Sequence, residues 1–305
     1  MTSPVTLAGA TGQLGSRIAA ALHERGAPVR LLLRPGSAAG LSDHVPGERI
    51  EADYRDADAL ARAVAGSAIV VSAVSGLAPV IVDAQTALLD AAVRAGVPRF
   101  MPSDFAVDFT RIARDGSNRN LDLRRTFMQR LDAAPIRATS IMNGAFADML
   151  TGQMPLILFP LRRIVYAGSA DQKLDFTTID DTARYAAHAA LDPDAPRLLR
   201  IAGDQINARE LAAIMTELTG RRHGLLRMGS IGTLSAMIAI ARRVAPGTGQ
   251  LYPAWQGMQY MRSMFSGEVA MTHLDNDRYP GLRWTSVRAV LDDHLRGGRP
   301  PIRFS

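Results

Sequence analysis

The stretch "VTLAGATGQLGSRIAAALHERG" at residues 5–26 decides the fold, because an apolar run passes through three glycines into a helical pattern. Gly9, Gly12 and Gly15 follow one another at intervals of three, which gives G-x-x-G-x-x-G rather than the commoner G-x-G-x-x-G. A glycine loop between a strand and a helix brings backbone amides close to a phosphate. The stretch therefore predicts a dinucleotide-binding turn. The alternative is that the glycines only make a tight turn.

The first half of the chain repeats this strand-and-helix alternation. Further apolar strands are expected at 28–34, 49–53, 68–76, 97–103 and 136–144, and helices at 15–26, 56–66, 78–96 and 120–134. Such alternation is typical of an α/β fold with a doubly wound, Rossmann-type parallel sheet. In the helix at 120–134, Leu123, Phe127 and Leu131 are expected on the inner face.

The pattern changes after residue 150. Short strands and turns come first, then helices at 180–192, with Asp180 as a plausible cap, and at 207–220, with Asn207 and Glu210 at capping-box spacing. A methionine-rich helical stretch over 229–272 and a closing helix at 285–297 follow. We therefore predict an NADP-binding domain over 1–150 and a smaller, mostly helical substrate lobe over 151–305. Residues 177–205 are expected to pack back onto the sheet.

Composition limits the class of protein. The 305 residues contain no cysteine, and no apolar run approaches the roughly 20 residues that span a bilayer. The net charge of +6 is carried by scattered arginines rather than by one basic stripe. We expect a cytoplasmic protein that acts on a small molecule, with neither a nucleic-acid nor a membrane partner. A homodimer is compatible with the sequence.

The residue at the end of the second strand indicates which dinucleotide binds. An acid there accepts hydrogen bonds from a free ribose 2′-hydroxyl, but this chain has Arg34, whose guanidinium suits a 2′-phosphate. This favours NADPH over NADH, with a plain surface arginine as the alternative. Asp53, after the third strand, is expected beside the adenine or as a helix cap. Val74 and Ser75 end the fourth strand and are expected along the middle of the cofactor.

The usual catalytic groups are missing from the sequence. The only lysine, Lys173, has no tyrosine four residues before it, so the Tyr-x-x-x-Lys pair of ordinary short-chain dehydrogenases is absent. The six histidines form no metal-binding pair, and we predict no metal site. The sequence predicts a cofactor site without an obvious acid or base.

Several segments together resemble the NmrA-like family of atypical short-chain reductases, close to the isoflavone-reductase-like group. The resemblance runs in order over about residues 5–220. Its segments are "GATGQLG" (9–15), "LLR" (32–34), "EADYRDADAL" (51–60), "DAAVRAGVPRFMPSDFAVD" (90–108), "MNGAFAD" (142–148) and "GSADQKLDFTTIDDTAR" (168–184).

The resemblance implies a set of residues that hold NADPH. In that family the glycine loop, the arginine after the second strand, the end of the fourth strand and the "PS[DE]F" turn do so. Carried over, and together with Gly9, the residues are Thr11, Gly12, Gln13, Leu14, Arg34, Val74, Ser75, Ser103 and Phe105.

The isoflavone-reductase-like enzymes also use a lysine in the helix after this turn, and that place falls on or near Arg124. Arginine can orient an oxygen but does not donate a proton at neutral pH. Asp104 and Asn143 are the other candidates for a chemical role beside the nicotinamide. Asp104 could equally cap the next segment, and Asn143 could serve the backbone.

The leading hypothesis is an NADPH-dependent reductase of a small, largely apolar carbonyl or enone-type metabolite. The expected pocket walls are Phe105, Met142, Phe146, Trp255, Met258 and Tyr260. The alternative for the last three is simple core, because they occur in a stretch with helical spacing. A second hypothesis is a dinucleotide-sensing regulator that binds NADP(H) without turnover and controls a partner protein. A third is a non-redox enzyme that keeps the cofactor as a relic.

Overall fold

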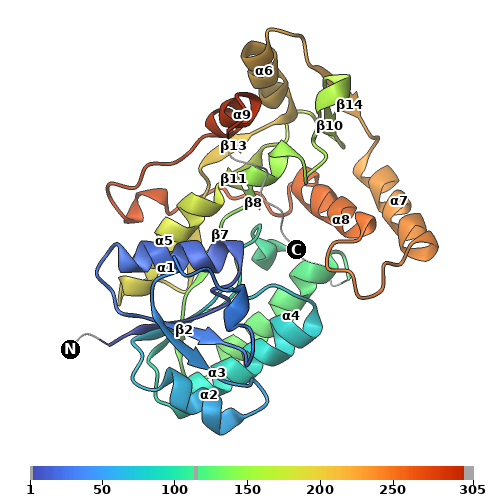
Figure 1. Ribbon diagram of the computed structural model, residues 1–305. Coiled ribbons are helices and arrows are strands. Elements are labelled where there is room, and N and C mark those ends of the chain that lie inside the picture. Colours follow the sequence, from blue (N-terminus) through green and yellow to red (C-terminus); the bar gives the residue numbers. More distant parts are fainter. Residues whose placement is uncertain (1–2, 113–115, 299–305) are drawn as a thin grey trace.

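The computed structural model describes residues 3–112 and 116–298 and contains a parallel six-stranded sheet (Figure 1). The strand order is β3-β2-β1-β4-β5-β6, and the direction of winding reverses between β1 and β4. The strands are β1 (Val5–Ala8), β2 (Val29–Leu33), β3 (Glu48–Glu51), β4 (Ile69–Ser72), β5 (Arg99–Met101) and β6 (Arg137–Ala138). This confirms the predicted Rossmann-type sheet. Ligands bind such sheets at the reversal.

Helices cover both faces of the sheet, as the near-continuous apolar strands require. α1 (Gln13–His23) packs against α5 (Ile179–Leu191) on one face. The other face carries α2 (Ala57–Val64), α3 (Gln85–Arg94) and α4 (Arg119–Ala133). A π-helical segment, Pro79–Ala84, precedes α3, so the predicted helix at 78–96 has two parts.

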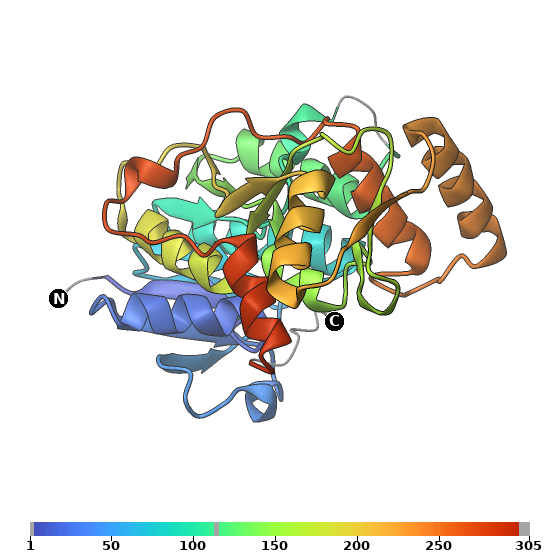
Figure 2. The same cartoon turned by 90° about the horizontal axis from the view of Figure 1, so that it is seen from above.

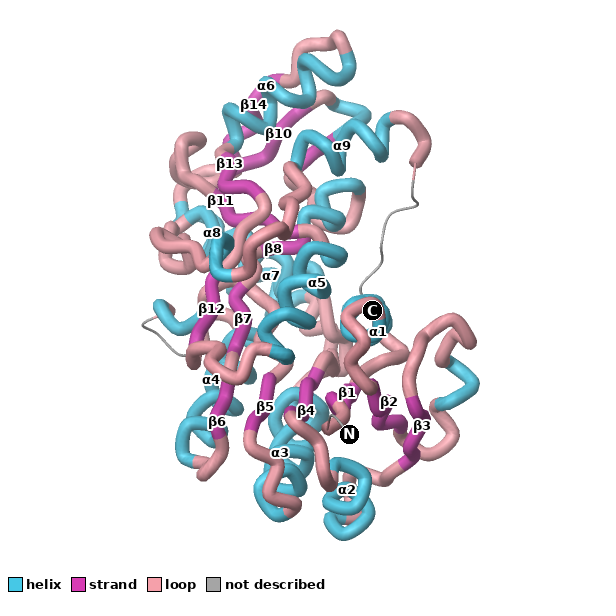
Figure 3. Tube along the Cα trace, turned by 90° about the vertical axis from the view of Figure 1, so that its left-hand side faces the viewer, coloured by secondary structure: helices cyan, strands magenta, loops and turns pink. Residues whose placement is uncertain are grey.

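Segments from the second half of the chain extend the sheet at its β6 edge. β6 continues past Thr139 into β7 (Ser140–Met142), which pairs in parallel with β12 (Leu198–Arg200). Figure 3 shows β7 above β6, with β12 beside it. Together with α5 against α1, this brings residues 179–200 onto the sheet. The domain division near residue 150 stays a prediction.

The second lobe contains strands as well as helices. One three-stranded sheet joins β8 (Ala145–Phe146), β11 (Leu174–Thr177) and β13 (Asp204–Ile206). Another joins β9 (Ile157–Leu158), β10 (Arg163–Tyr166) and β14 (Gly224–Arg227). The helices are α6 (Ala208–Thr219), α7 (Ile231–Val244), α8 (Ala254–Phe265) and α9 (Val287–Leu295). Figure 2 shows α7 at the rim of this lobe, next to α8.

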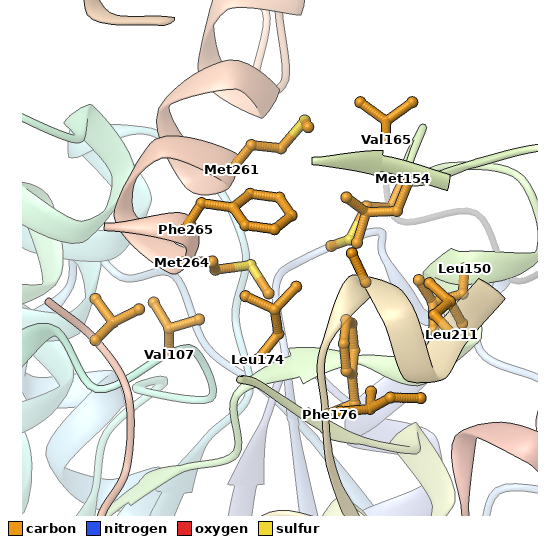
Figure 4. Packing of buried hydrophobic residues seen from close by; sticks show 14 of the residues in the cluster. Val107, Leu150, Met154, Val165, Leu174, Phe176, Leu211, Met261, Met264 and Phe265 are labelled. Carbon is orange, nitrogen blue, oxygen red and sulfur yellow. The ribbon is translucent and has the colours of Figure 1, made fainter. Parts of the chain in front are cut away.

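The core of the second lobe is where the methionines of α8 lie. Met261, Met264 and Phe265 are buried and face Leu174 and Val107 (Figure 4). These α8 residues are therefore core. Within the described ranges, no helix has both the length and the apolar character needed to cross a membrane.

Two local expectations need correction. Thr178, not Asp180, caps α5: its hydroxyl accepts from the Asp181 amide at 3.1 Å, while Asp180 pairs with Arg17 of α1 at 2.6 Å. In α4 the buried apolar residues are Leu121, Phe127 and Leu131, and Leu123 is only half-buried. By contrast, the predicted capping box of α6 is present, with both Asn207–Glu210 hydrogen bonds.

The inner face of α4 can be tested by matched truncations. Phe127 is fully buried, with its ring 6.1 Å from that of Phe100. Phe127→Ala should therefore lower the free energy of unfolding by about 3–5 kcal/mol. Leu123→Ala should cost about 1 kcal/mol or less, as expected for a half-buried side chain. Urea unfolding followed by circular dichroism measures both. Equal losses would show that the face is assigned wrongly.

Candidate functional site

The glycine turn brings α1 unusually close to the sheet. Gly9 has φ +90°, and a Cβ on it would lie 2.6 Å from the main chain of Ala73, just after β4. A Cβ on Gly15 would lie 2.2 Å from the Gly9 carbonyl oxygen. Neither position tolerates a side chain without moving the backbone. The turn therefore fixes where the N-terminus of α1 meets the end of β1.

The first turn of α1 faces the solvent without a side-chain cap. Gly12 is the N-cap residue, and its amide donates to the Gly9 carbonyl at 3.0 Å. Thr11, Gly12 and Gln13 are exposed, and Leu14 is half-buried. The amides at a helix N-terminus carry partial positive charge and suit a phosphate. The geometry fits the predicted pyrophosphate site.

Arg34 follows β2 directly and is exposed, beyond the C-terminal edge of the sheet. In the described part of the chain its guanidinium forms no ion pair. Its nearest titratable neighbour is Tyr54, whose pKa burial raises to about 12 while the charge of Arg34 lowers it. Arg34 thus presents an unneutralised cation at the place predicted for a 2′-phosphate.

Asp53 is engaged by a neighbour. Arg55 donates to the Asp53 carboxylate from its side chain at 2.7 Å and from its amide at 2.9 Å, and these bonds lower the pKa of Asp53 to about 2. Asp56, not Asp53, caps α2. The alternative of a cap is therefore wrong for Asp53, and its contact with adenine stays a prediction.

The turn at Ser103 is bonded to the segment after β4, to the start of α3 and to α4. The Ser103 hydroxyl donates to the Val74 carbonyl at 2.6 Å, and the Ser103 amide donates to Gln85 Oε1 at 2.9 Å. Gln85 is buried, and its Nε2 donates to the Ile81 carbonyl at 2.7 Å. Sequence reasoning missed Gln85. Its only signal was one polar residue within an apolar helix face.

The neighbours of this turn differ in accessibility. Ser75 is exposed and Val74 is half-buried, so both end β4 where a ligand could reach them. Phe105 is buried in the core between α1 and the sheet. The contacts of Val74, Ser75 and Phe105 with the cofactor stay predictions. A contact by buried Phe105 would require the turn to move.

Asp104 points into the protein, away from any solvent-accessible pocket. Its carboxyl is fully buried, and Oδ2 accepts from the Ser140 hydroxyl at 2.7 Å. Arg197 donates to the same hydroxyl at 2.7 Å. Burial raises the pKa of Asp104 to about 6. In this conformation Asp104 positions the turn against β7, and its predicted contact with substrate stays a prediction.

Arg124 lies against the Ser103 turn from α4. Its Nε donates to the Ser103 carbonyl and its Nη1 donates to the Asn120 carbonyl, both at 3.2 Å. No described carboxylate pairs with it. Carbonyl oxygens hold the guanidinium in place without neutralising its charge. Arg124 is therefore the cation of the predicted chemical site.

Asn143, just after β7, is fully buried with an unpartnered side chain. Its main chain is held by the Ala106 carbonyl at 2.9 Å and by the Thr177 hydroxyl at 2.7 Å. Neither side-chain polar atom has a partner in the described residues. An unpaired buried amide costs about 1–3 kcal/mol. The Asn143 amide is thus available to hydrogen-bond, but a ligand would need an opening to reach it.

The expected pocket walls divide into core and accessible residues. Met142 is fully buried and Trp255 is 5% exposed, so neither has surface for a ligand in this conformation. Trp255 donates to the Pro246 carbonyl at 3.0 Å and lies between the Arg119 and Arg242 guanidinium groups. Phe146, Met258 and Tyr260 are half-buried. Of these, Tyr260 lies within reach of the charge of Arg124. Burial raises the pKa of Tyr260, and Arg124 opposes part of that rise.

A buried polar junction places α8 on the start of α4. Gln256 donates to Asn118 Oδ1 at 2.8 Å, and Gln259 Oε1 accepts from the Arg119 amide at 3.1 Å. Both glutamines are buried. Sequence reasoning missed this junction. Through it the second lobe contacts α4, the helix that carries Arg124.

The chain was compared with known proteins. The sequence model of the NmrA-like family matches residues 1–230. Pinoresinol reductase 1 of Arabidopsis thaliana is 28% identical over 314 residues, which cover 96% of each chain. The isoflavone reductase homolog IRL of Zea mays is 29% identical over 239 residues, 72% of this chain and 75% of its own.

Solved structures share the fold. One described as AtPrR2 with NADP+ and (+)pinoresinol has a TM-score of 0.79 at 22% identity, covering 96% of this chain and 99% of its own. A crystal structure of isoflavone reductase has a TM-score of 0.80 at 18% identity, with the same coverage.

The buried carboxyl of Asp104 makes a prediction about stability and pH. Its pKa is raised from 3.8 to about 6 by burial, so the folded state holds a proton that the unfolded state releases. The contribution of Asp104 to the free energy of unfolding is therefore complete below about pH 4. It is lost as the pH rises through about 6, and the loss amounts to about 3 kcal/mol. Asp104→Asn should remove this pH dependence.

Urea unfolding of both proteins between pH 4 and 7 measures the effect. The exposed Asp90 on α3 offers a matched control, and Asp90→Asn should leave the wild-type slope intact. Parallel stability curves for wild type and Asp104→Asn would contradict the assignment.

Proposed function

Because this chain belongs to the NmrA-like family, we propose that it is an NADPH-dependent reductase of a small, largely apolar carbonyl or enone-type metabolite. The observation that carries the proposal is Arg34, an exposed and unneutralised cation placed after β2 beside a glycine turn that leaves no room for a side chain. NADPH is the dinucleotide whose 2′-phosphate requires such a cation.

The residues present fit this cofactor. Gly9 and Gly15 let α1 approach the sheet so closely that a Cβ on either would meet main chain, and the N-terminus of α1 has no side-chain cap. Val74 and Ser75 lie at the reversal of strand order, where such ligands bind. When bound, NADPH supplies a hydride to the substrate. The relatives support a reductase, since their names state reduction of pinoresinol and relation to isoflavone reductase.

Arg124 has a defined part in this function. Its guanidinium sits beside the Ser103 turn and keeps its proton at neutral pH, so it orients a substrate oxygen and stabilises negative charge developing there. Met258 and Phe146 are half-buried and keep the accessible apolar surface expected of pocket walls. The cytoplasmic location and the homodimer stay predictions.

A second function, a sensor that binds NADP(H) without turnover and controls a partner protein, draws on the same residue. An arginine in the expected place of the lysine preserves a positive charge but removes a proton donor. A sensor needs only the positive charge, because it binds the cofactor without transferring a proton.

The cofactor preference has a direct test in Arg34→Glu. Loss of a charge-assisted contact with the 2′-phosphate, and its replacement by repulsion, should weaken NADPH binding by about 30-fold or more. NADH binding should change by about threefold or less, because NADH has no 2′-phosphate. Fluorescence titration of both cofactors measures this, with the exposed Arg62→Glu on α2 as the charge-matched control. Equal weakening of both cofactors would exclude contact between Arg34 and the 2′-phosphate.

Turnover separates a reductase from a sensor. The wild-type protein should oxidise NADPH in the presence of at least one of pinoresinol, an isoflavone, an enone, a quinone or acetophenone, followed by absorbance at 340 nm. Tight NADPH binding without oxidation by any of these, together with a co-purifying protein, would instead support the sensor. Oxidation with any of them rules the sensor out.

A further inference from the structure

A reduction of this kind needs a proton as well as a hydride, and the chain's only lysine cannot give it. Lys173 lies in the second lobe, where it pairs with Glu210 at 2.7 Å and donates to the Gln205 carbonyl. Arg124 keeps its own proton. Asp104 is fully buried against Ser140. The proton donor must therefore be another group that reaches Arg124.

α8 presents one polar stripe to α4. Gln256, Gln259, Tyr260 and Ser263 follow the i, i+3, i+4, i+7 spacing of one helix face, while Met261, Met264 and Phe265 enter the core of the second lobe. The stripe is held in register, because Gln256 bonds Asn118 and Gln259 bonds the Arg119 amide. This register places the next residue, Tyr260, beside the Asn120 side chain and within reach of the charge of Arg124.

Tyr260 and Arg124 lie close to the turn that holds the cofactor. The Asn120 amide lies beside the Tyr260 hydroxyl, and the Asn120 carbonyl accepts from Arg124 at 3.2 Å. Arg124 in turn donates to the Ser103 carbonyl. Along the contact between α4 and α8, the Tyr260 phenol is therefore followed by the Arg124 guanidinium and then by the Ser103 turn.

We propose that Tyr260 is the proton donor of this reductase and that Arg124 holds the oxygen that receives the proton. The proposal rests on the proposed function. In the step, a hydride forms the new C–H bond at the carbonyl carbon, and the π electron pair of the C=O bond moves to oxygen. That oxygen takes the proton of the Tyr260 hydroxyl. The phenolate is stabilised by Arg124 and regains a proton from water.

The charges around Tyr260 suit a neutral donor. Burial raises its pKa to about 12, and Tyr252 adds to the rise, while Arg124, Arg119 and the Asn120 amide oppose it. The phenol therefore keeps its proton at neutral pH, and the two arginines favour the phenolate when the proton leaves. A lysine in the family position combines charge and proton in one side chain, whereas here the two properties belong to two residues.

The simpler alternative is that Tyr260 is only an apolar wall. The two roles differ in kinetics, since loss of a wall raises KM, whereas loss of a general acid lowers kcat, typically by about 100-fold or more. Tyr260→Phe keeps the ring and removes only the hydroxyl. Tyr166→Phe is the matched control, because Tyr166 is also half-buried, belongs to β10 and lies outside the stripe.

The first measurement uses NADPH and the carbonyl compound of the screen that wild type reduces fastest. Tyr260→Phe should lose about 100-fold or more in kcat with KM and the NADPH dissociation constant changed by about threefold or less. Tyr166→Phe should match wild type. Retention of more than about a tenth of wild-type kcat by Tyr260→Phe would overturn the proposal. Failure of wild type to oxidise NADPH with any compound of the screen would instead overturn the proposed function.

The second measurement does not depend on turnover. 4-Nitrophenolate carries an anionic oxygen like the one that receives the proton, and its binding to the NADP+ complex can be followed by absorbance near 400 nm. Tyr260→Phe and Arg124→Gln should each weaken its binding by about tenfold or more, as expected for loss of a charge-assisted hydrogen bond, and Tyr166→Phe should not. Equal affinity in all variants, or no binding by wild type, would overturn the proposal.

Discussion

The site depends on the hydrogen bonds that fix the main chain and hydroxyl of Ser103. The amide is bound by Gln85, the carbonyl by Arg124, and the hydroxyl by the carbonyl of Val74. These partners come from the helix behind β4, from α4 and from the end of β4 itself. In an ordinary surface loop, such polar groups would form hydrogen bonds with water. Held from three directions, this turn lies next to the segment after β4, one of the two strands between which the strand order reverses.

The fold could be predicted because its causes are local. A strand with apolar residues on both faces, a glycine that alone accepts φ +90°, and the 3.6-residue period of α1 are each visible within about 20 residues. The same holds for the capping box of α6. The prediction for the cap of α5 was wrong because the local sequence offers two good caps, Thr178 and Asp180. In the structure Asp180 forms an ion pair with Arg17 of α1, and Thr178 is the cap.

The rest of the site could not be predicted because its causes are tertiary. Gln85 resembles any polar residue on a helix until Ser103 is seen 18 positions away in sequence and 2.9 Å away in space. Asn118 and Gln256 are 138 positions apart. Asp104 follows Ser103 directly, and the sequence leaves open whether it contacts substrate or caps the next segment. The pairing of its carboxyl with Ser140 of β7 turns it inward, a contact that depends on the sheet being assembled.

The junction of α4 and α8 shows how a polar seam can set a register. Gln256 Oε1, Asn118 Nδ2 and Ser263 Oγ are buried without partners in the described residues, so the seam gives little stability of its own. The opposite face of α8 supplies the stability, through Met261, Met264 and Phe265. Apolar contacts therefore hold the helix to its lobe, and directional hydrogen bonds decide which residue meets Arg124. A shift by one residue would replace Tyr260 with Met261, which has no hydroxyl, so the polar seam determines whether a phenol faces α4.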